Sequence, residues 1–573
     1  GEHMRILHRW ALAAWLAASL APLAAQAAIP VTLLDYVDTA SPAYARFKGW
    51  VDPVVFDGAS RYAFSATDAA YMAVLDGDPA YCTHAVGMVE SQVAAAEAAM
   101  SPTTRPEIAG DSYLEVGPMI RDLALAYDWC AAQTTPAQRA RWAAYAQQAV
   151  WNVWNHEDAS WGGHPHPWSG WSVDDPGNNY YYSFVEATMY WSLASGDTAW
   201  RSFLETQKLP PLTAFFAALP GGGSREGTGY GLAHQRLFEL YRLWHAATGT
   251  DLAAQSTHAR DSIDFWIHAT VPSFDRYAPI GDLARESYPN LFDYHRNLVL
   301  QARALTGDAA FRERASWWLA RISVPRMSQG FNYRHDLLPA GGDGSAPGAR
   351  HYLATGTGNL FARSGWDADA IWMHFIAGPY DQSHAHQEQG GFTLFARDFL
   401  AVSENVFSHS GIQQGTEVHN VLRFVQDGAT VPQREGTTSS LAVSVDAGGA
   451  VVATANLTPA YGGSPAVVSW QRELRFAGRT LRVHDTYATG PGTTAVFQVN
   501  TPVLPVVAGT TARAGGLRVR VLAPANPVMS VVDWTTVDGA EFGSGYKLEI
   551  RGGSGEYLVE LVDDVALFAD GFE

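Results

Sequence analysis

The chain has 573 residues, a formal net charge of −19 and a hydrophobic content of 47%. This length exceeds one ordinary domain, and this composition can form large apolar cores. Lysine occurs only at positions 48, 208 and 547, and no basic run is present, so nucleic acid and anionic membranes are poor partners.

The N-terminus has the pattern of a secretory signal. Residues 1–3 read as an expression remnant, and residues 4–27 as the signal peptide. Arg5 and Arg9 precede an apolar run over 10–23, and Ala25-Gln26-Ala27 is a small-residue cleavage site. We therefore expect a periplasmic or secreted protein. No later stretch is long and apolar enough to span a bilayer.

Residues 28–335 predict helices joined by short turns. Apolar residues recur at helical spacing over 119–130, 137–154, 184–193, 232–244, 263–268 and 298–305. Gly-Asp or Gly-Thr-Asp breaks follow at 196, 249 and 307. Repeated helical hairpins of this kind favour an (α/α) toroid, that is, an incomplete or closed helical barrel. Cys82 and Cys130 could form a disulfide in an oxidising compartment, but the sequence does not decide it.

Two irregular segments interrupt the helices. Residues 151–182 are rich in aromatic side chains, among them Trp168 and Trp171, and residues 220–230 are rich in glycine. Loops this long inside a compact domain are usually functional. Flat rings suit the apolar faces of sugars, although they also suit a core.

The second half of the chain reads as β-structure. We interpret residues 336–349 as a Gly- and Pro-rich linker, 350–565 as an antiparallel β-sandwich and 566–573 as an exposed tail. Short strands with turn residues between them are expected at 371–376, 467–476, 480–486, 517–522 and 557–561.

The histidine pair at 384 and 386 begins this second domain. If it lies on a strand, both imidazoles face one site, because residues i and i+2 point to the same side. The apolar runs 392–396 and 399–402 predict a hairpin that ends at Glu404, and His419 follows. Two histidines and a carboxylate suit tetrahedral zinc. The plainer alternative is a set of surface or hydrogen-bonded histidines.

Four stretches occur in a characteristic order. They are Tyr127-Asp128-Trp129, Asn178-Asn179, Glu226-Gly-Thr-Gly-Tyr230, and Arg363-Ser-Gly-Trp366 followed by Ser383-His-Ala-His386. Together they resemble the heparinase II/III-like and alginate-lyase superfamily of polysaccharide lyases. The resemblance implies β-elimination at a uronic acid residue of an anionic polysaccharide. One group neutralises the sugar carboxylate, a base removes the C5 proton and an acid protonates the departing O4.

The resemblance also implies roles for single residues. Asn179 would hydrogen-bond the carboxylate, although Asn178 could exchange roles with it and asparagine is also a good helix N-cap. Tyr230 would be the catalytic tyrosine, and as a base it would need a pKa depressed by positive charge. His384 would be an auxiliary base or a carboxylate contact. Arg363 and Glu226 would be further substrate contacts, with an ion pair as the alternative for Arg363. Trp168 and Trp171 are expected to contact the substrate as flat rings of the aromatic loop.

A structural zinc ion is implied as well, held by His386, Glu404 and His419. One position departs from the pattern: Tyr180 stands where the family has histidine after the two asparagines. Tyr180 could replace that histidine, or His164 or His166 could reach in from the aromatic loop. The loss of the histidine could instead restrict the enzyme to one C5 epimer.

Two other functions remain open. A glycoside hydrolase would need two carboxylates across its cleft, and Asp174, Asp175 and Glu226 are available. A non-catalytic glycan-binding protein would keep the fold without the chemistry. The polymer is not readable, since alginate, glucuronan, glycosaminoglycans and bacterial exopolysaccharides all fit. The acidic composition argues mildly against highly sulfated heparin.

Overall fold

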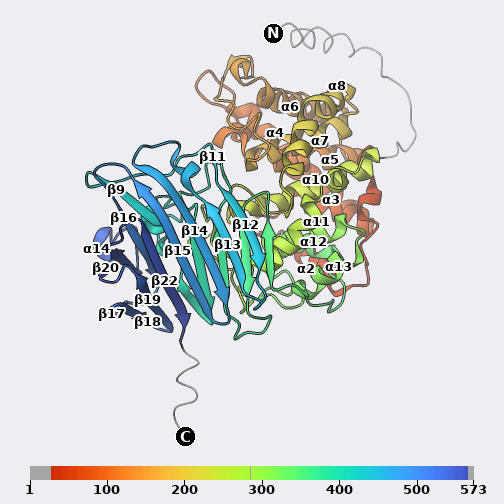
Figure 1. Cartoon of the computed structure of the whole chain (residues 1–573). Coiled ribbons are helices and arrows are strands. Elements are labelled where there is room, and N and C mark those ends of the chain that lie inside the picture. The colour runs from red at the N-terminus through yellow and green to blue at the C-terminus, as the bar shows by residue number, and fades with distance from the viewer. Residues whose placement is uncertain (1–26, 284–285, 565–573) are drawn as a thin grey trace.

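The computed structural model describes residues 27–283 and 286–564 as a helical domain followed by a β-sandwich (Figure 1). The predicted signal peptide, apart from its last residue, and the predicted tail lie outside these described residues. Within the described ranges, no helix is long and apolar enough to cross a membrane.

Several helices begin and end at the Gly-Asp breaks that the sequence marks as caps. Gly196 ends one helix in the left-handed conformation, and the side chain of Asp197 then caps the next one. The helices are α2 (Pro42–Asp57), α3 (Ala66–Asp76), α4 (Pro79–Ala99), α5 (Val116–Trp129), α6 (Pro136–Trp154), α7 (Asn179–Ser195), α8 (Thr198–Phe203), α9 (Leu209–Ala217), α10 (His234–Thr248), α11 (His258–Ala269), α12 (Asp293–Leu305) and α13 (Ala309–Leu319).

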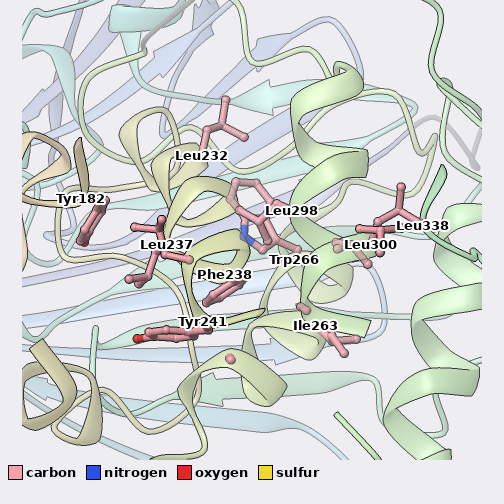
Figure 2. Close-up of a cluster of buried hydrophobic side chains, with 14 of the residues drawn as sticks. Tyr182, Leu232, Leu237, Phe238, Tyr241, Ile263, Trp266, Leu298, Leu300 and Leu338 are labelled. Carbon is pink, nitrogen blue, oxygen red and sulfur yellow. The ribbon is translucent and has the colours of Figure 1, made fainter. Parts of the chain in front are cut away.

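These helices form the predicted (α/α) toroid, whose interior contains two large clusters of buried apolar side chains. Figure 2 shows part of it, where Phe238 of α10, Trp266 of α11 and Leu298 of α12 pack together. A disulfide joins Cys82 of α4 to Cys130, the residue after α5. Cys82 and Cys130 are therefore paired, which the sequence alone did not decide.

The second domain contains three large antiparallel sheets. One has eight strands, in the order β12 (Ser440–Val445), β13 (Val451–Asn456), β14 (Val467–Ala477), β15 (Thr480–Thr489), β22 (Glu556–Asp563), β19 (Leu517–Ala523), β18 (Thr511–Ala514) and β17 (Val506–Ala508). A five-stranded sheet has the order β10 (Ala429–Thr430), β9 (Leu422–Gln426), β16 (Thr493–Thr501), β21 (Tyr546–Arg551) and β20 (Val528–Asp533). The third contains β3 (His351–Ala354), β4 (Asn359–Arg363), β5 (Trp372–Ile376), β7 (Phe392–Ala396) and β8 (Asp398–Ala401).

The third sheet is buried on both faces. Leu360, Met373 and Leu394 point into the core of the sandwich. The neighbouring residues Phe361, Trp372 and Phe395 point the other way, into the core of the toroid. Because successive side chains of a strand alternate between faces, this one sheet belongs to both cores and fixes the two domains against each other.

A buried ion pair holds the sandwich next to the histidine loops. Arg472 of β14 binds Asp485 of β15 through Nε and Nη2, both at 2.8 Å. Its Nη1 donates to the carbonyl oxygens of Gly390, at 2.6 Å, and Asn420, at 3.0 Å. These two residues follow His386 and His419 in the chain, so the guanidinium ties both histidine segments to the eight-stranded sheet.

We expect Arg472→Met to lower the free energy of unfolding by about 3–5 kcal/mol, because it leaves the buried charge of Asp485 without a cation and with only the indole N–H of Trp470, at 2.8 Å, as a donor. Urea denaturation followed by tryptophan fluorescence measures this. The double variant Arg472→Met/Asp485→Leu should recover much of the loss. The control is Arg475→Met on the same strand, whose partner Asp446 is partly exposed and whose loss should cost much less. Equal effects of Arg472→Met and Arg475→Met would contradict the role of the buried pair.

Candidate active site

The candidate site lies where the toroid meets the sandwich, and a crossing segment over 278–282 joins the two. On the toroid side, the backbone N–H of Thr228 donates to the carbonyl oxygen of Ile280 at 2.8 Å, and its hydroxyl donates to that of Ala278 at 2.6 Å. On the sandwich side, the N–H of Asp282 donates to the carbonyl oxygen of His384 at 2.8 Å. The loop of Tyr230 and the loop of His384 are thus held at fixed positions.

Glycine is required at the centre of this contact. Gly281 has φ +68°, and a Cβ there would lie 2.6 Å from the carbonyl oxygen of Glu226 and 2.7 Å from that of His384. Gly227, with φ +97°, would place a Cβ 2.2 Å from the carbonyl oxygen of Ile280. Backbones approach this closely only where side chains are absent.

Tyr230 and His384 stack on each other at the centre of the site. Their ring centroids are 3.5 Å apart and the planes differ by 8°. His384 and His386 do not lie on a strand, because both belong to the loop between β6 (Pro379–Tyr380) and β7. They nevertheless face one group, as expected: Asp282 accepts from His384 Nδ1 at 2.9 Å and from His386 Nε2 at 2.7 Å.

Asp282 is a functional candidate that the sequence analysis missed. Gln414 also donates to its two carboxylate oxygens, at 3.1 and 3.2 Å. Burial would raise the pKa of Asp282, but the hydrogen bonds from His384, His386 and Gln414 hold it below its usual value. The aspartate therefore stays ionised and fixes the orientation of both imidazoles.

The environment of Tyr230 favours the neutral phenol. Burial raises its pKa, and nearby carboxylates raise it further: Asp282, Glu226 and Asp111. A base would need a lowered pKa, so these surroundings suit a proton donor instead. Tyr180 is similar, since its hydroxyl donates to Asp111 at 3.0 Å. Burial, this bond and the nearby Tyr230 raise the pKa of Tyr180 to about 12.

The two asparagines have different positions. Asn178 is the N-cap of α7, and its Oδ1 accepts from the N–H of Tyr180 at 3.0 Å. Asn179 is the first residue of α7 and half-buried; its Oδ1 is buried and has no hydrogen-bond partner among the described residues. Its backbone N–H donates to the carboxyl group of Glu226. The capping alternative thus applies to Asn178, and Asn179 keeps a free amide.

Glu226 is buried, so it presents almost no surface to a substrate. Burial, the charge of Asp175 and, more weakly, Asp282 raise its pKa well above the usual value, although the N–H of Asn179 opposes this. A neutral carboxyl group at this position links the loop of Tyr230 to the start of α7.

The remaining predicted contacts are spread around the site. Arg363 is buried; its Nη2 donates to the carbonyl oxygens of His268 and Thr270 at 3.1 and 2.7 Å, and burial lowers its pKa to about 9. Trp168 packs in the toroid and donates to the carbonyl oxygen of Asn152 at 2.9 Å. Trp171 is 46% exposed and open to a sugar.

The three predicted zinc ligands do not converge as one set. His386 Nδ1 and His419 Nε2 lie 3.0 Å apart, so they could share a proton or bind one cation. Both carboxylate oxygens of Glu404 are buried without a hydrogen-bond partner in the described ranges, and burial raises its pKa to about 9. Among the described residues, no three His, Cys, Asp or Glu side chains lie close enough to hold a metal. The donor types fit zinc, but the assembled site is incomplete.

No family model matches the chain, and no curated protein matches it in sequence. Solved structures are similar to it. Heparan sulfate lyase HepC from Pedobacter heparinus has a TM-score of 0.57 and 14% identity, over 92% of this chain and 84% of that chain. Heparinase III has a TM-score of 0.59 and 13% identity, over 93% and 89%. At these identities the similarity shows a shared fold, a helical toroid followed by a β-sandwich.

Glu226→Gln should change how stability depends on pH. The pKa of Glu226 is raised in the folded protein, so the stability it contributes is present below its ordinary pKa and is lost as pH rises toward the folded value. We therefore expect the stability of the variant relative to the wild type to increase as the pH rises above the ordinary pKa of a glutamate. Urea denaturation at several pH values measures the difference.

The matched variant for this test is Glu226→Ala. It also removes the titrating group, but it leaves the N–H of Asn179 unpaired and should be less stable at every pH, by about 1–3 kcal/mol. Parallel pH curves for the wild type and Glu226→Gln would show that Glu226 does not titrate as its burial implies.

Proposed function

We propose that this protein is an exported polysaccharide lyase that cleaves a uronic acid polymer by β-elimination. The observation that carries the proposal is the stacked pair Tyr230–His384, with His384 held by Asp282. The shared fold supports the enzyme class, because the similar structures are named heparan sulfate lyase and heparinase III.

In this mechanism His384 is the base that removes the C5 proton. Its Nδ1 is bound to Asp282, and the side chain is 22% exposed, so Nε2 is the nitrogen that can accept a proton. Asp282 holds the ring in this tautomer and stabilises the imidazolium that forms, as a carboxylate does for histidine in other acid–base sites.

Tyr230 is the acid in the same mechanism. Its raised pKa keeps the phenol protonated, so it can donate to O4 as the bond between C4 and O4 breaks. The electron pair of the C5–H bond moves into the uronate and forms the C4–C5 double bond as O4 leaves. The free amide of Asn179 is the group available to hydrogen-bond the carboxylate, whose oxygens carry the developing charge.

Tyr180 supports this arrangement without replacing the missing histidine. Its phenol is fixed by Asp111 next to Tyr230, and its raised pKa makes it a poor base. His166 is also unsuited, because its Nε2 hydrogen-bonds the carbonyl oxygen of Ser101.

A glycoside hydrolase is supported less well. The side chain of Asp174 is 87% exposed and paired with Lys208 at 2.9 Å, and Glu226 is buried. Of the three candidate carboxylates, only Asp175 remains half-buried beside the site, and hydrolysis requires two.

Export and zinc belong to the proposal as well. The signal-like N-terminal sequence and the disulfide Cys82–Cys130 both fit an oxidising compartment. His386 and His419, whose facing nitrogens are 3.0 Å apart, would hold the zinc ion, and Glu404 would have to move toward them to become the third ligand. The ion would cross-link the sandwich wall behind His384 and would take no part in the chemistry.

Lyase activity predicts a rise in ultraviolet absorbance from unsaturated uronides when the protein meets its polymer. The panel contains alginate, glucuronan, glycosaminoglycans and bacterial exopolysaccharides. Tyr230→Phe should lower kcat by about 10²–10⁴-fold, because it removes the proton donor. The control is Tyr62→Phe, since Tyr62 is 84% exposed on the toroid surface.

A flat absorbance trace accompanied by new reducing ends would support the hydrolase instead. Binding without any product would identify a glycan-binding protein.

Zinc binding predicts about one zinc per chain in protein purified from zinc-supplemented cultures. Elemental analysis should find much less in His419→Ala and in Glu404→Gln. His484→Ala is the control, because His484 is exposed and paired with Glu556. Absence of zinc from the wild type would favour the alternative in which His386 and His419 are hydrogen-bonded to each other.

A further inference from the structure

The loops that form the site carry a single basic residue. Residues 172–183, 220–231 and 378–388 contain Asn179, Tyr230 and His384, and Arg225 is their only Lys or Arg. The same loops carry five carboxylates: Asp174, Asp175, Glu226, Asp381 and Glu388. Burial keeps Glu226 neutral and Asp174 is paired with Lys208 from outside these loops. Asp175 and Asp381 still give an anion at this site more negative charge than the single positive charge of Arg225.

Arg225 lies between the loop of Tyr230 and the loop of His384. Its Nη1 donates to Asp381 Oδ2 at 3.1 Å, and its guanidinium lies over the ring of Phe215, 5.3 Å from the centroid. Arg225 directly precedes Glu226, whose carbonyl oxygen faces Gly281. Asp381 is three residues before His384. The ion pair therefore joins the two loops that bring the acid and the base together.

This ion pair is incomplete on both sides. Arg225 Nε and Asp381 Oδ1 are buried without a hydrogen-bond partner among the described residues. By contrast, Arg314 binds both oxygens of Asp264, at 2.7 and 3.0 Å. A guanidinium has five N–H donors in a planar fork that fits a carboxylate with two parallel bonds. The donors of Arg225 are only partly used.

The pair is also open to solvent. The side chain of Arg225 is 18% exposed and that of Asp381 36%. A partly exposed pair of this kind stabilises the fold less than a fully buried one. A second carboxylate can therefore displace Asp381 at small cost.

We propose that Arg225 binds the carboxylate of a uronic acid residue at this site, and that the site accepts polymers whose only anionic groups are carboxylates. This inference rests on the proposed function for its substrate class. One guanidinium balances one carboxylate. A sulfate group would add a negative charge beside Asp175 and Asp381 with no second cation in these loops to balance it, and like charges in contact oppose binding.

Equilibrium binding tests this without turnover. In the Tyr230→Phe protein, isothermal titration compares unsulfated oligosaccharides of glucuronate, mannuronate, guluronate and galacturonate. It includes the same oligosaccharides after reduction of their carboxylates to alcohols, and a heparin-derived sulfated oligosaccharide of equal length. We expect at least one unsulfated oligosaccharide to bind and the sulfated one to bind more weakly.

Substitutions of the two partners of the ion pair should change the affinity for the acidic oligosaccharide in opposite directions. Arg225→Gln should weaken binding of the unsulfated acid by about 10- to 100-fold, as expected for a lost charge-assisted hydrogen bond, and leave binding of the reduced oligosaccharide unchanged. Asp381→Asn should strengthen binding of the acid several-fold, because it removes the competing carboxylate. Arg201→Gln is the control, since Arg201 of α8 is about half-exposed and paired with the equally exposed Glu205.

Several results would overturn the inference. Equal losses for the acid and the reduced oligosaccharide, or weaker binding in both Arg225→Gln and Asp381→Asn, would make the pair a structural support. Tight binding of the sulfated ligand would refute the substrate class. The absence of binding to any oligosaccharide of the panel would refute it as well. Arg225-dependent binding without any unsaturated product would uphold the inference and refute the lyase proposal.

Discussion

The site depends on one constraint, which is that a single β-sheet belongs to two cores. The sheet of β3, β4, β5, β7 and β8 packs one face into the core of the sandwich and the other into the core of the toroid. Two domains joined by a surface contact would be free to shift relative to each other. Here, separating them would expose Phe361, Trp372 and Phe395, whose burial stabilises the joint by about 1.5–3 kcal/mol for each side chain. Tyr230 from one domain can therefore stack on His384 from the other with a fixed geometry.

Electrostatics then separates the roles of the two stacked rings. Both are close to Asp282, but they respond in opposite ways to its charge. A carboxylate opposes ionisation of a phenol, since that would create a second negative charge, and favours protonation of an imidazole, since that creates a positive one. The same aspartate therefore favours Tyr230 as the proton donor and His384 as the acceptor. No positive charge needs to be placed beside the tyrosine.

Sequence reasoning reached the architecture because the signals for it are local. Gly196 and Asp197 mark a helix end and a helix start by their own chemistry, and the apolar runs before Glu404 form the expected hairpin of β7 and β8. Asp282 could not be found in this way. It lies 102 residues from His384, next to an apolar segment and outside any motif, and only the folded chain brings it there.

Burial was the other quantity that the sequence could not supply. Glu226 lies in a glycine-rich loop beside a catalytic candidate, which is typical of a substrate contact, yet the loop turns its carboxyl group inward to the start of α7. The lowered pKa expected for Tyr230 was inferred only from what a catalytic base needs. In the folded chain the phenol is partly buried and lies near carboxylates, and both raise its pKa.

The stacking of acid and base also bears on stereochemistry. Two rings with centroids 3.5 Å apart reach a bound sugar from the same side. In the proposed mechanism the C5 proton taken by His384 and the O4 protonated by Tyr230 must then lie on one face of the sugar ring. That relation holds in 4-linked glucuronate and mannuronate, and it is reversed in their C5 epimers, iduronate and guluronate. An elimination from the opposite face would need a second base on the other side of the sugar. Tyr180 is a poor candidate for it, since its phenol is bound to Asp111 and its pKa is raised to about 12. The geometry of the pair and the departure at position 180 thus favour the same class of uronic acid.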